Sequence, residues 1–426
     1  NSLFNKGLLN IQLRYKHFLF FSKFLSKILL LVCFLCLSIV NVWAEGSKEL
    51  NPAGGDRVYL QSSTTANENV PFPSQGLVRV YAKQGEVLYL GSSAQGVGNG
   101  TIRVIAPNGT LYNSGASTII GRINNRTEEL AGPGAGGYTP YTITVGAGQE
   151  GVWSVFFIPP GNAGGNAGSA IDAAGVNAFA STQRGNTEYI IAFDVSVRNT
   201  ANTAFILGRA YMNGFAASMQ SYNRKFKSTF YVQTFDGYLY EVIPQDKTGY
   251  IFNFFSNNKG VRDVNGDPTY QSFNSTEAPA PNIHHPFSED TATDVTHKIF
   301  FNNPSTDLPL TAQGRIHGGA YPAATTAGTF WLKKTPTPPY ASDVTFVGKE
   351  GTTNKAGTSP LGGYIHFKTN QPGSFFVNID VNSNGSFTDP IDVKIEGPAI
   401  TGDNVMYWDG RDGLGNKIYG NIIIQP

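Results

Sequence analysis

The feature that most constrains the fold of this chain is a series of short alternating apolar segments separated by glycine and asparagine turns. No sustained helical period occurs after residue 44. In the stretch GTIRVIAPNGTLYNSG, for example, Ile102 and Leu111 lie on either side of the turn dipeptide Asn108-Gly109. Period-two alternation is typical of half-buried strands, and Asn-Gly supplies the positive φ angles of a tight hairpin. With 49 glycines, 24 prolines and only 14% charged residues, the chain is predicted to be all-β, built of tandem antiparallel β-sandwich domains.

A cleaved helical signal peptide is predicted at the N-terminus, so that residues 1–44 form a leader. Lys23 and Lys27 precede the uncharged, mostly apolar residues 28–40, and the segment NVWA that follows ends in a small residue suited to cleavage. This order of basic, apolar and cleavable segments is that of a secretory signal. The competing interpretation is a membrane anchor, because residues 28–44 approach the minimum length of a span. Once the signal is cleaved, we expect no stable membrane span.

The rest of the chain is slightly acidic and carries no cysteine. The leader holds five cations and no acid, which leaves 26 Lys+Arg against 30 Asp+Glu in residues 45–426. This balance gives no electrostatic reason to bind DNA or RNA, so we expect no nucleic-acid partner. The only two cysteines, Cys33 and Cys36, lie in the leader, so the mature chain is expected to form no disulfide. A large β core without disulfides is compatible with an exported bacterial protein.

Composition and turn spacing divide the rest of the chain into four predicted segments. Residues 45–75 are polar and mixed, and are interpreted as an extended lead-in. Residues 76–200 and 201–340 are predicted to be two β-sandwich domains, the second with an irregular polar connection and a Pro-rich linker near its end. Residues 343–426 show strand signals every eight to twelve residues or so, which predicts an Ig-like sandwich. Because the first methionine is Met212 and the last residues form an apolar strand without a following partner, we expect the protein to extend beyond both ends of this sequence, which would leave the Ig-like domain truncated.

One loop, DVNSNGSFTDPID, matches the first half of a calcium-binding motif. Its first six positions follow the spacing D-x-[DN]-x-[DN]-G, but position twelve, which normally holds a bidentate glutamate, is Ile391. A β-loop calcium site is one interpretation, because Ca²⁺ accepts six to eight oxygen ligands in flexible geometry. The other is an Asx-rich hairpin loop whose side chains bond their own backbone. The candidate calcium ligands are Asp380, Asn382, Asn384, Asp389 and Asp392.

The stretch YWDGRDGLGN, residues 407–416, supports either a metal site or a turn. Asp409 and Asp412 are the second-choice metal ligands. The dipeptides Asp-Gly and Gly-Asn favour turn chemistry, with Tyr407 and Trp408 on opposite faces of the preceding strand and Trp408 in or near the core. A weaker echo of the calcium motif, RDVNGDP, occurs at residues 262–268.

No sequence motif for an activated nucleophile or for phosphate binding is present. The pair His284-His285 and His297 lie near acidic residues but lack the spacing of zinc ligands, so we expect exposed loop histidines. Paired carboxylates of a glycoside hydrolase leave no local sequence signal, because their pairing is spatial. Exposed tryptophans would be sugar platforms, but the alternating strands around Trp153, Trp331 and Trp408 favour core positions.

Two stretches in the last domain, DVNSNGSFTDPIDVKIEG and NVMYWDGRDGLGNKI, resemble Ig-like modules of large secreted surface proteins of Bacteroidota. Those proteins typically end in a gliding-motility-associated sorting domain that the type IX secretion system reads. The W-D-G-x-D-x-x-G-N core is also similar to the FlgD-type Ig-like fold, and residues 80–115 and 230–260 resemble the N-terminal region of the same large proteins. The resemblance implies export and display outside the cell, and no catalytic residue. The sequence departs from the family in having no C-terminal sorting domain.

Together these observations predict a non-enzymatic exported protein of the bacterial cell surface, serving as an adhesin or extracellular-matrix component. Its expected partners are the export machinery and a surface glycan or protein ligand. The alternative is a secreted carbohydrate-binding or carbohydrate-processing protein, and an enzyme of that kind would show two convergent carboxylates about 5–9 Å apart. Calcium is the only cofactor that the sequence suggests.

Overall fold

Nearly all regular structure in the computed structural model is antiparallel β-strand, which confirms the predicted all-β fold with sandwich character. The leader and signal peptide predicted at residues 1–44 lie outside the described residues. Among the helices that the structure describes, none is both long and apolar enough to cross a membrane. The described residues are 45–51, 57–62, 72, 76–160, 189–218, 225–245, 247–249, 251–267, 269, 283–318, 321, 324–350, 361–418 and 423–425.

The described helices are short: α2 (Ser47–Leu50) and α3 (Arg126–Ala131). The strands up to the linker are β1 (Tyr59–Gln61), β2 (Leu77–Ala82), β3 (Val87–Ser92), β4 (Thr101–Ile105), β5 (Leu111–Asn113), β6 (Tyr141–Thr144), β7 (Gly151–Ile158), β8 (Tyr189–Ile190), β9 (Phe193–Arg198), β10 (Phe205–Ile206), β11 (Ala210–Met212), β12 (Gly214–Ser218), β13 (Lys225–Phe226), β14 (Phe230–Gln233), β15 (Leu239–Val242), β16 (Lys247–Thr248), β17 (Ile251–Phe255), β18 (Lys298–Phe300), β19 (Thr311–Ile316) and β20 (Thr326–Trp331). The strands after it are β21 (Ala341–Gly348), β22 (Gly363–Thr369), β23 (Gly373–Asp380), β24 (Val393–Ala399), β25 (Gly402–Trp408) and β26 (Ile423–Gln425).

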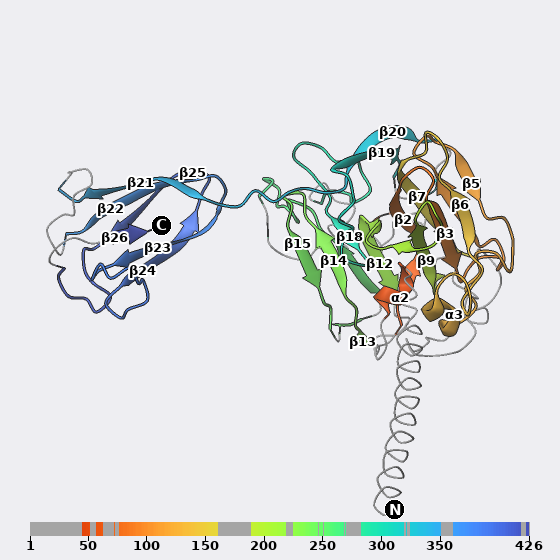
Figure 1. Ribbon diagram of the computed structural model, residues 1–426, viewed down its shortest axis with the longest axis horizontal. Helices are drawn as coiled ribbons and strands as arrows, with labels where there is room; N and C mark the ends of the chain where they lie inside the picture. The colour runs from red at the N-terminus through yellow and green to blue at the C-terminus, as the bar shows by residue number, and fades with distance from the viewer. Residues whose placement is uncertain are drawn as a thin grey trace, which may run out of the picture. The chain divides into compact units, whose positions relative to one another are not determined.

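The chain forms two compact units, residues 1–335 and residues 336–426. Their boundary falls within the segment predicted to be a Pro-rich linker, where prolines cannot donate to a sheet ladder. The domain boundary predicted at residue 200 is wrong, because one eight-stranded sheet takes strands from both sides of it. The strand order of that sheet is β15-β14-β18-β11-β2-β7-β4-β5 (Figure 1). At its centre Ala210 of β11 pairs with Val80 of β2, a contact between segments far apart in sequence.

The core of the first unit takes residues from this sheet and from two four-stranded sheets, β10-β9-β3-β6 and β17-β12-β1-β8. Val80 and Trp153 contribute to it from the large sheet, Leu90 and Val197 from the second, and Phe215 from the third. Alternating apolar residues from three sheets therefore share one buried cluster, as in a sandwich. Burial on this scale is the main driving force for folding of the unit.

The extended lead-in predicted at residues 45–75 is wrong for its described part, which is built into the unit. Strand β1 lies between β12 and β8. Glu45 is buried, and its carboxylate accepts hydrogen bonds from the backbone N–H groups of Gly208 at 2.6 Å and Arg209 at 3.2 Å. Burial raises the pKa of Glu45 to about 7. The polar composition of the segment led to the prediction of an extended lead-in. Its polar groups are nevertheless buried, because they form hydrogen bonds inside the fold.

A buried ion triad joins the N-terminal segment to α3. The Glu129 carboxylate accepts hydrogen bonds from Arg57 and, at 2.7 Å, from Arg126, and the hydroxyl of Ser47 donates to it at 2.5 Å. The charged side chains of all three triad members are at most 2% exposed. Burial alone would raise the pKa of Glu129, but the charges of Arg57 and Arg126 outweigh burial and hold that pKa below its usual value. The single carboxylate therefore pairs with both guanidinium groups, and the triad keeps a net charge of +1 inside the protein.

The second unit consists of two three-stranded sheets, β21-β22-β25 and β24-β23-β26 (Figure 1). Its core takes Ile365 and Trp408 from the first sheet and Val377 and Ile379 from the second. Trp408 is 4% exposed, whereas its neighbour Tyr407 is 44% exposed. The predicted placement of these two aromatics on opposite faces of one strand is confirmed, because side chains alternate along a strand.

Candidate functional site

The five predicted calcium ligands lie together on the loop between β23 and β24. Asp380, the last residue of β23, is completely buried. Its carboxylate accepts hydrogen bonds from the backbone N–H groups of Asn384 at 3.3 Å and Gly385 at 2.8 Å. Gly385 has a φ of 82°, a left-handed conformation that glycine adopts without strain. Asp380 therefore closes a tight turn of the loop.

The two remaining carboxylates hold the other side of the loop. Asp389 accepts hydrogen bonds from the side-chain amides of Asn382 at 3.0 Å and Asn384 at 2.6 Å, and these bonds lower its pKa. Asp392 accepts from the backbone N–H groups of Val381 at 3.1 Å and Asp389 at 2.9 Å. The structure thus shows the Asx-rich loop with its side chains bonded locally. In the described parts of the chain, no group of three or more His, Cys, Asp or Glu residues is arranged to hold a metal ion.

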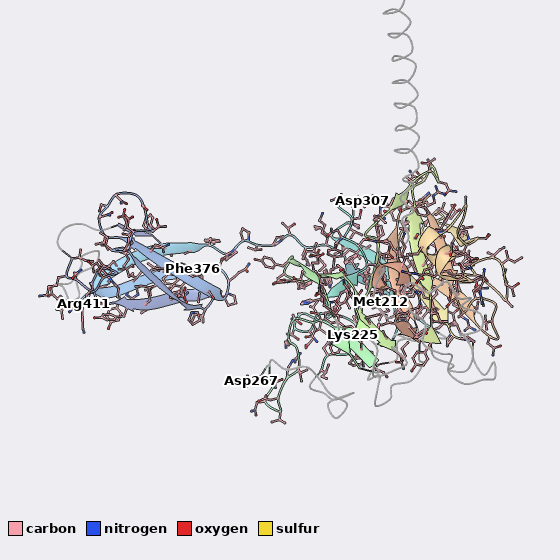
Figure 2. All side chains as sticks on the ribbon, turned by 90° about the horizontal axis from the view of Figure 1, so that it is seen from below. Met212, Lys225, Asp267, Asp307, Phe376 and Arg411 are labelled. Atoms are coloured by element: carbon pink, nitrogen blue, oxygen red, sulfur yellow. The ribbon has the colours of Figure 1, made fainter. Side chains whose placement is uncertain are left out.

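The second-choice ligands Asp409 and Asp412 serve a turn. Asp412 accepts hydrogen bonds from the backbone N–H groups of Leu414 at 2.9 Å and Asn416 at 2.7 Å. Asp409 accepts one from the backbone of Arg411 at 3.0 Å. In a turn, some backbone N–H groups have no backbone acceptor, and here the two carboxylates accept their hydrogen bonds. The turn interpretation of this stretch is therefore confirmed. Figure 2 places Arg411 in the second unit.

The weaker calcium echo at residues 262–268 is a second self-bonded turn. One carboxylate oxygen of Asp263 accepts hydrogen bonds from the backbone N–H groups of Asn265 at 2.8 Å and Asp267 at 3.0 Å. Those bonds lower the pKa of Asp263. Asp267 lies on a loop that projects from the first unit (Figure 2).

The three tryptophans considered as sugar platforms are all buried. Trp153 is completely buried, Trp331 is 6% exposed and Trp408 is 4% exposed. An aromatic platform for a sugar needs an open ring face, so these residues are core residues, as their alternating strands favoured.

The expectation of exposed loop histidines is wrong, because His284, His285 and His297 are all partly buried. The ring of His285 packs on Phe72 with the centroids 4.6 Å apart, and burial lowers the pKa of His285 to about 4. Burial also lowers the pKa of His297 to about 4. His285 and His297 are therefore neutral near pH 7.

A serine–histidine pair that carries no sequence signal occurs inside the first unit. The Nε2 atom of His317 lies 2.9 Å from the hydroxyl of Ser154, and both residues are buried. Burial lowers the pKa of His317 to about 2, far below the value near neutrality that suits a general base. Its Nδ1 atom has no hydrogen-bond partner within the described ranges, so no carboxylate orients the ring. The pair therefore packs β7 against the segment after β19.

A hollow of about 760 Å³ opens on the first unit beside the β14–β15 hairpin. We call it the hairpin hollow. Its apolar wall includes Val242 and Phe254, and the ring of Phe254 packs on Phe230 with centroids 4.9 Å apart. Two aromatic side chains at its rim are exposed to solvent, Tyr240 by 55% and Phe235 by 37%. Its volume falls within the range of about 300–1,000 Å³ that small-molecule sites occupy.

Polar groups converge on the same hollow from the end of β17 and the residue before β18. The Nδ1 atom of His297 lies 2.9 Å from the hydroxyl of Ser256. The side-chain oxygen of Asn257 accepts from the backbone N–H of Lys259 at 2.9 Å. The side-chain nitrogen of Asn257 is buried and has no hydrogen-bond partner in the described part of the chain. The hollow therefore holds an unused donor, which costs free energy unless a ligand or water bonds to it.

No sequence motif marks this hollow, because its walls come from segments that only the tertiary fold brings together. The dipeptide Asp236-Gly237, which is typical of hairpin turns, joins β14 to β15 beside the hollow, with Gly237 at a φ of 96°. Comparison with known proteins gives no further guide to it, since no protein-family model, no curated protein and no solved structure matches the chain.

Proposed function

We propose that this protein is a non-enzymatic exported component of the bacterial cell surface, acting as an adhesin or as part of the extracellular matrix. The observation that carries the proposal is a secretory pattern of basic, apolar and small residues placed ahead of a low-charge, all-β chain. Two β units, each with its own core and joined through a Pro-rich segment, suit a modular surface protein. The resemblance of the last domain to Bacteroidota surface modules supports the same role, with the type IX secretion system as the export partner.

Surface display is tested with an epitope-tagged chain produced in a bacterium of this group. Intact cells are labelled with antibody and treated with a protease that does not enter them. We expect labelling of intact cells, loss of the tag on protease treatment, and a mature form shorter than the precursor by the mass of the leader. A full-length protein found only inside the cell would contradict the proposal.

Calcium binding by the loop between β23 and β24 is part of this proposal. Asp380 is a fully buried carboxylate, and buried charges are usually paired with a cation or bound to a metal. No described ion pair includes it. The loop offers carboxylate and amide oxygens, the ligands that Ca²⁺ prefers.

We expect 1 mM CaCl₂ to raise the melting temperature of the second unit, because an ion that binds only the folded state stabilises it by about 2.7 kcal/mol at a concentration of about 100 Kd. Scanning calorimetry of the protein in CaCl₂ and in a calcium chelator measures this. Asp389→Asn should abolish the shift, whereas Asp409→Asn, in the neighbouring turn, should leave it intact. An equal melting temperature in calcium and chelator would eliminate the site.

A further inference from the structure

We propose that the hairpin hollow binds an uncharged oligosaccharide. This inference deepens the proposed surface role by naming the chemical class of its ligand. The exposed ring of Tyr240 lies at the rim, where a sugar ring can pack its C–H groups against the negative face of the aromatic ring. The Ser256–His297 pair lines the hollow and offers hydrogen bonds to sugar hydroxyls, and the unpartnered Asn257 nitrogen is buried in the wall beside it. A polar ligand with apolar ring faces matches this mixed lining.

The charged residues that line the hollow favour uncharged glycans over acidic ones. Asp236 and Glu241 line it, and no lysine or arginine does among the described lining residues. His297 is neutral near pH 7, since burial depresses its pKa. Acidic sugars such as uronates would therefore meet the two carboxylates that line the hollow, and like charges at close range are repelled. A cation near the rim, Lys334, lies over the ring of Phe235, with its Nζ atom 4.3 Å from the ring centroid. Carboxylates still accept hydrogen bonds from neutral hydroxyls.

The test is isothermal titration of the purified protein with hexasaccharides of cellulose, xylan and mannan as neutral probes, oligogalacturonate as the acidic probe and chitosan hexamer as the cationic probe. At least one neutral probe should bind with a Kd of about 1 mM or tighter, and oligogalacturonate should not. Tyr240→Ala should weaken binding about tenfold, by removing the ring contact.

Two controls match the Tyr240→Ala variant. Leu239→Ala changes the exposed neighbour of Tyr240 on β15, a residue outside the lining, and Tyr340→Ala removes an exposed tyrosine of the second unit. Both should bind as the parent does. Binding of none of the neutral probes, equal binding of the acidic probe, binding of the cationic probe alone, or unchanged affinity in Tyr240→Ala would each overturn the inference. If the protein cleaved a bound oligosaccharide probe into shorter pieces, the proposal that it is not an enzyme would be overturned. The inference that the hollow binds an oligosaccharide would still hold.

A second, independent observation concerns the start of the described chain. The backbone nitrogen of Glu45 lies 3.4 Å from Oδ1 of Asp194 and 3.3 Å from the hydroxyl of Ser196. Asp194 is 3% exposed, and its other oxygen accepts from the hydroxyl of Tyr138 at 2.9 Å. No described ion pair includes Asp194, so a buried carboxylate faces the nitrogen of the residue that follows the predicted cleavage site.

We infer that removal of the leader after Ala44 gives Glu45 an α-ammonium group that pairs with Asp194. Hydrolysis of the peptide bond 44–45 adds hydroxyl to the carbonyl carbon of Ala44 and a proton to the nitrogen of Glu45. The resulting amine, with an ordinary pKa of about 7.7–8.0, takes up a further proton near neutral pH. Processing thereby adds a positive charge beside Asp194, in addition to that of Lys48, and stabilises the first unit. This ion pair forms only if the leader is removed, so the inference rests on the proposed export. It is tested by the stability of the protein, whereas export is tested by where the protein is found.

The test compares the chain that begins at Glu45 with the same chain preceded by Gly-Ser, which moves the ammonium group away. Urea unfolding should show the extended chain to be less stable. Asp194→Asn should remove that difference, since a double-mutant cycle isolates the pair. An equal effect of the extension with and without Asp194→Asn would overturn the inference, as would a secreted protein whose first residue is not Glu45.

Discussion

Glu129→Ala should destabilise the first unit by about 3–5 kcal/mol, the usual effect of removing one partner from a buried ion pair. Arg57 and Arg126 would remain buried without their counter-charge. Because small domains are stable by only about 5–15 kcal/mol, the loss would leave a sizeable unfolded fraction near 37 °C. Urea titration followed by hydrogen exchange and mass spectrometry measures it, since peptides report on each unit separately.

Two further variants separate charge from packing. Glu129→Gln keeps the shape of the side chain but not its charge, so it should be destabilising as well. Glu396→Ala removes an exposed glutamate that lies 3.7 Å from Lys394, and should leave stability unchanged within error. A Glu129→Gln variant as stable as the parent would show that the two arginines need no counter-charge.

Trp408→Ala should destabilise the second unit by about 3–5 kcal/mol, because it leaves a large cavity in a small core. Trp408 packs against Phe346 with the ring centroids 6.1 Å apart, and its indole nitrogen donates to the backbone oxygen of Arg411 at 3.0 Å. The same exchange experiment should show faster exchange in residues 336–426 and unchanged protection in the first unit.

The neighbouring substitution Tyr407→Ala is the matched control for Trp408→Ala. Tyr407 is the next aromatic on the same strand but faces solvent, so its loss should cost far less. If Trp408→Ala and Glu129→Ala each lowered the protection of both units equally, the division of the chain near residue 336 would be refuted.

Local features of the fold were predictable from the sequence because their causes are local. The Asn108-Gly109 turn joins β4 to β5, with Gly109 at a φ of 91°, as hairpin chemistry requires. The opposite exposures of Tyr407 and Trp408 follow from alternation along one strand. In each case a few consecutive residues carry the whole signal.

Features that depend on distant partners were not predictable. The three-residue strand β1 carries little pattern of its own, and its position between β12 and β8 is set by tertiary pairing. The false boundary at residue 200 arose because β2 and β11 pair across it. Among the site candidates, the loop between β23 and β24 was recognisable because its residues are contiguous, whereas the hairpin hollow combines Tyr240, Asn257 and His297 from three segments.

The strand order of the large sheet also dictates when the first unit can fold. Strand β18, near residue 300, fills the gap between β14 and β11, and β2 sits between β11 and β7. Such a high contact order makes folding slow, because long loops must close before their contacts form. Until residue 300 has emerged from the ribosome, β11 and β14 present open edges that invite aggregation. The large sheet of the first unit therefore cannot be completed until about three hundred residues of the chain are available.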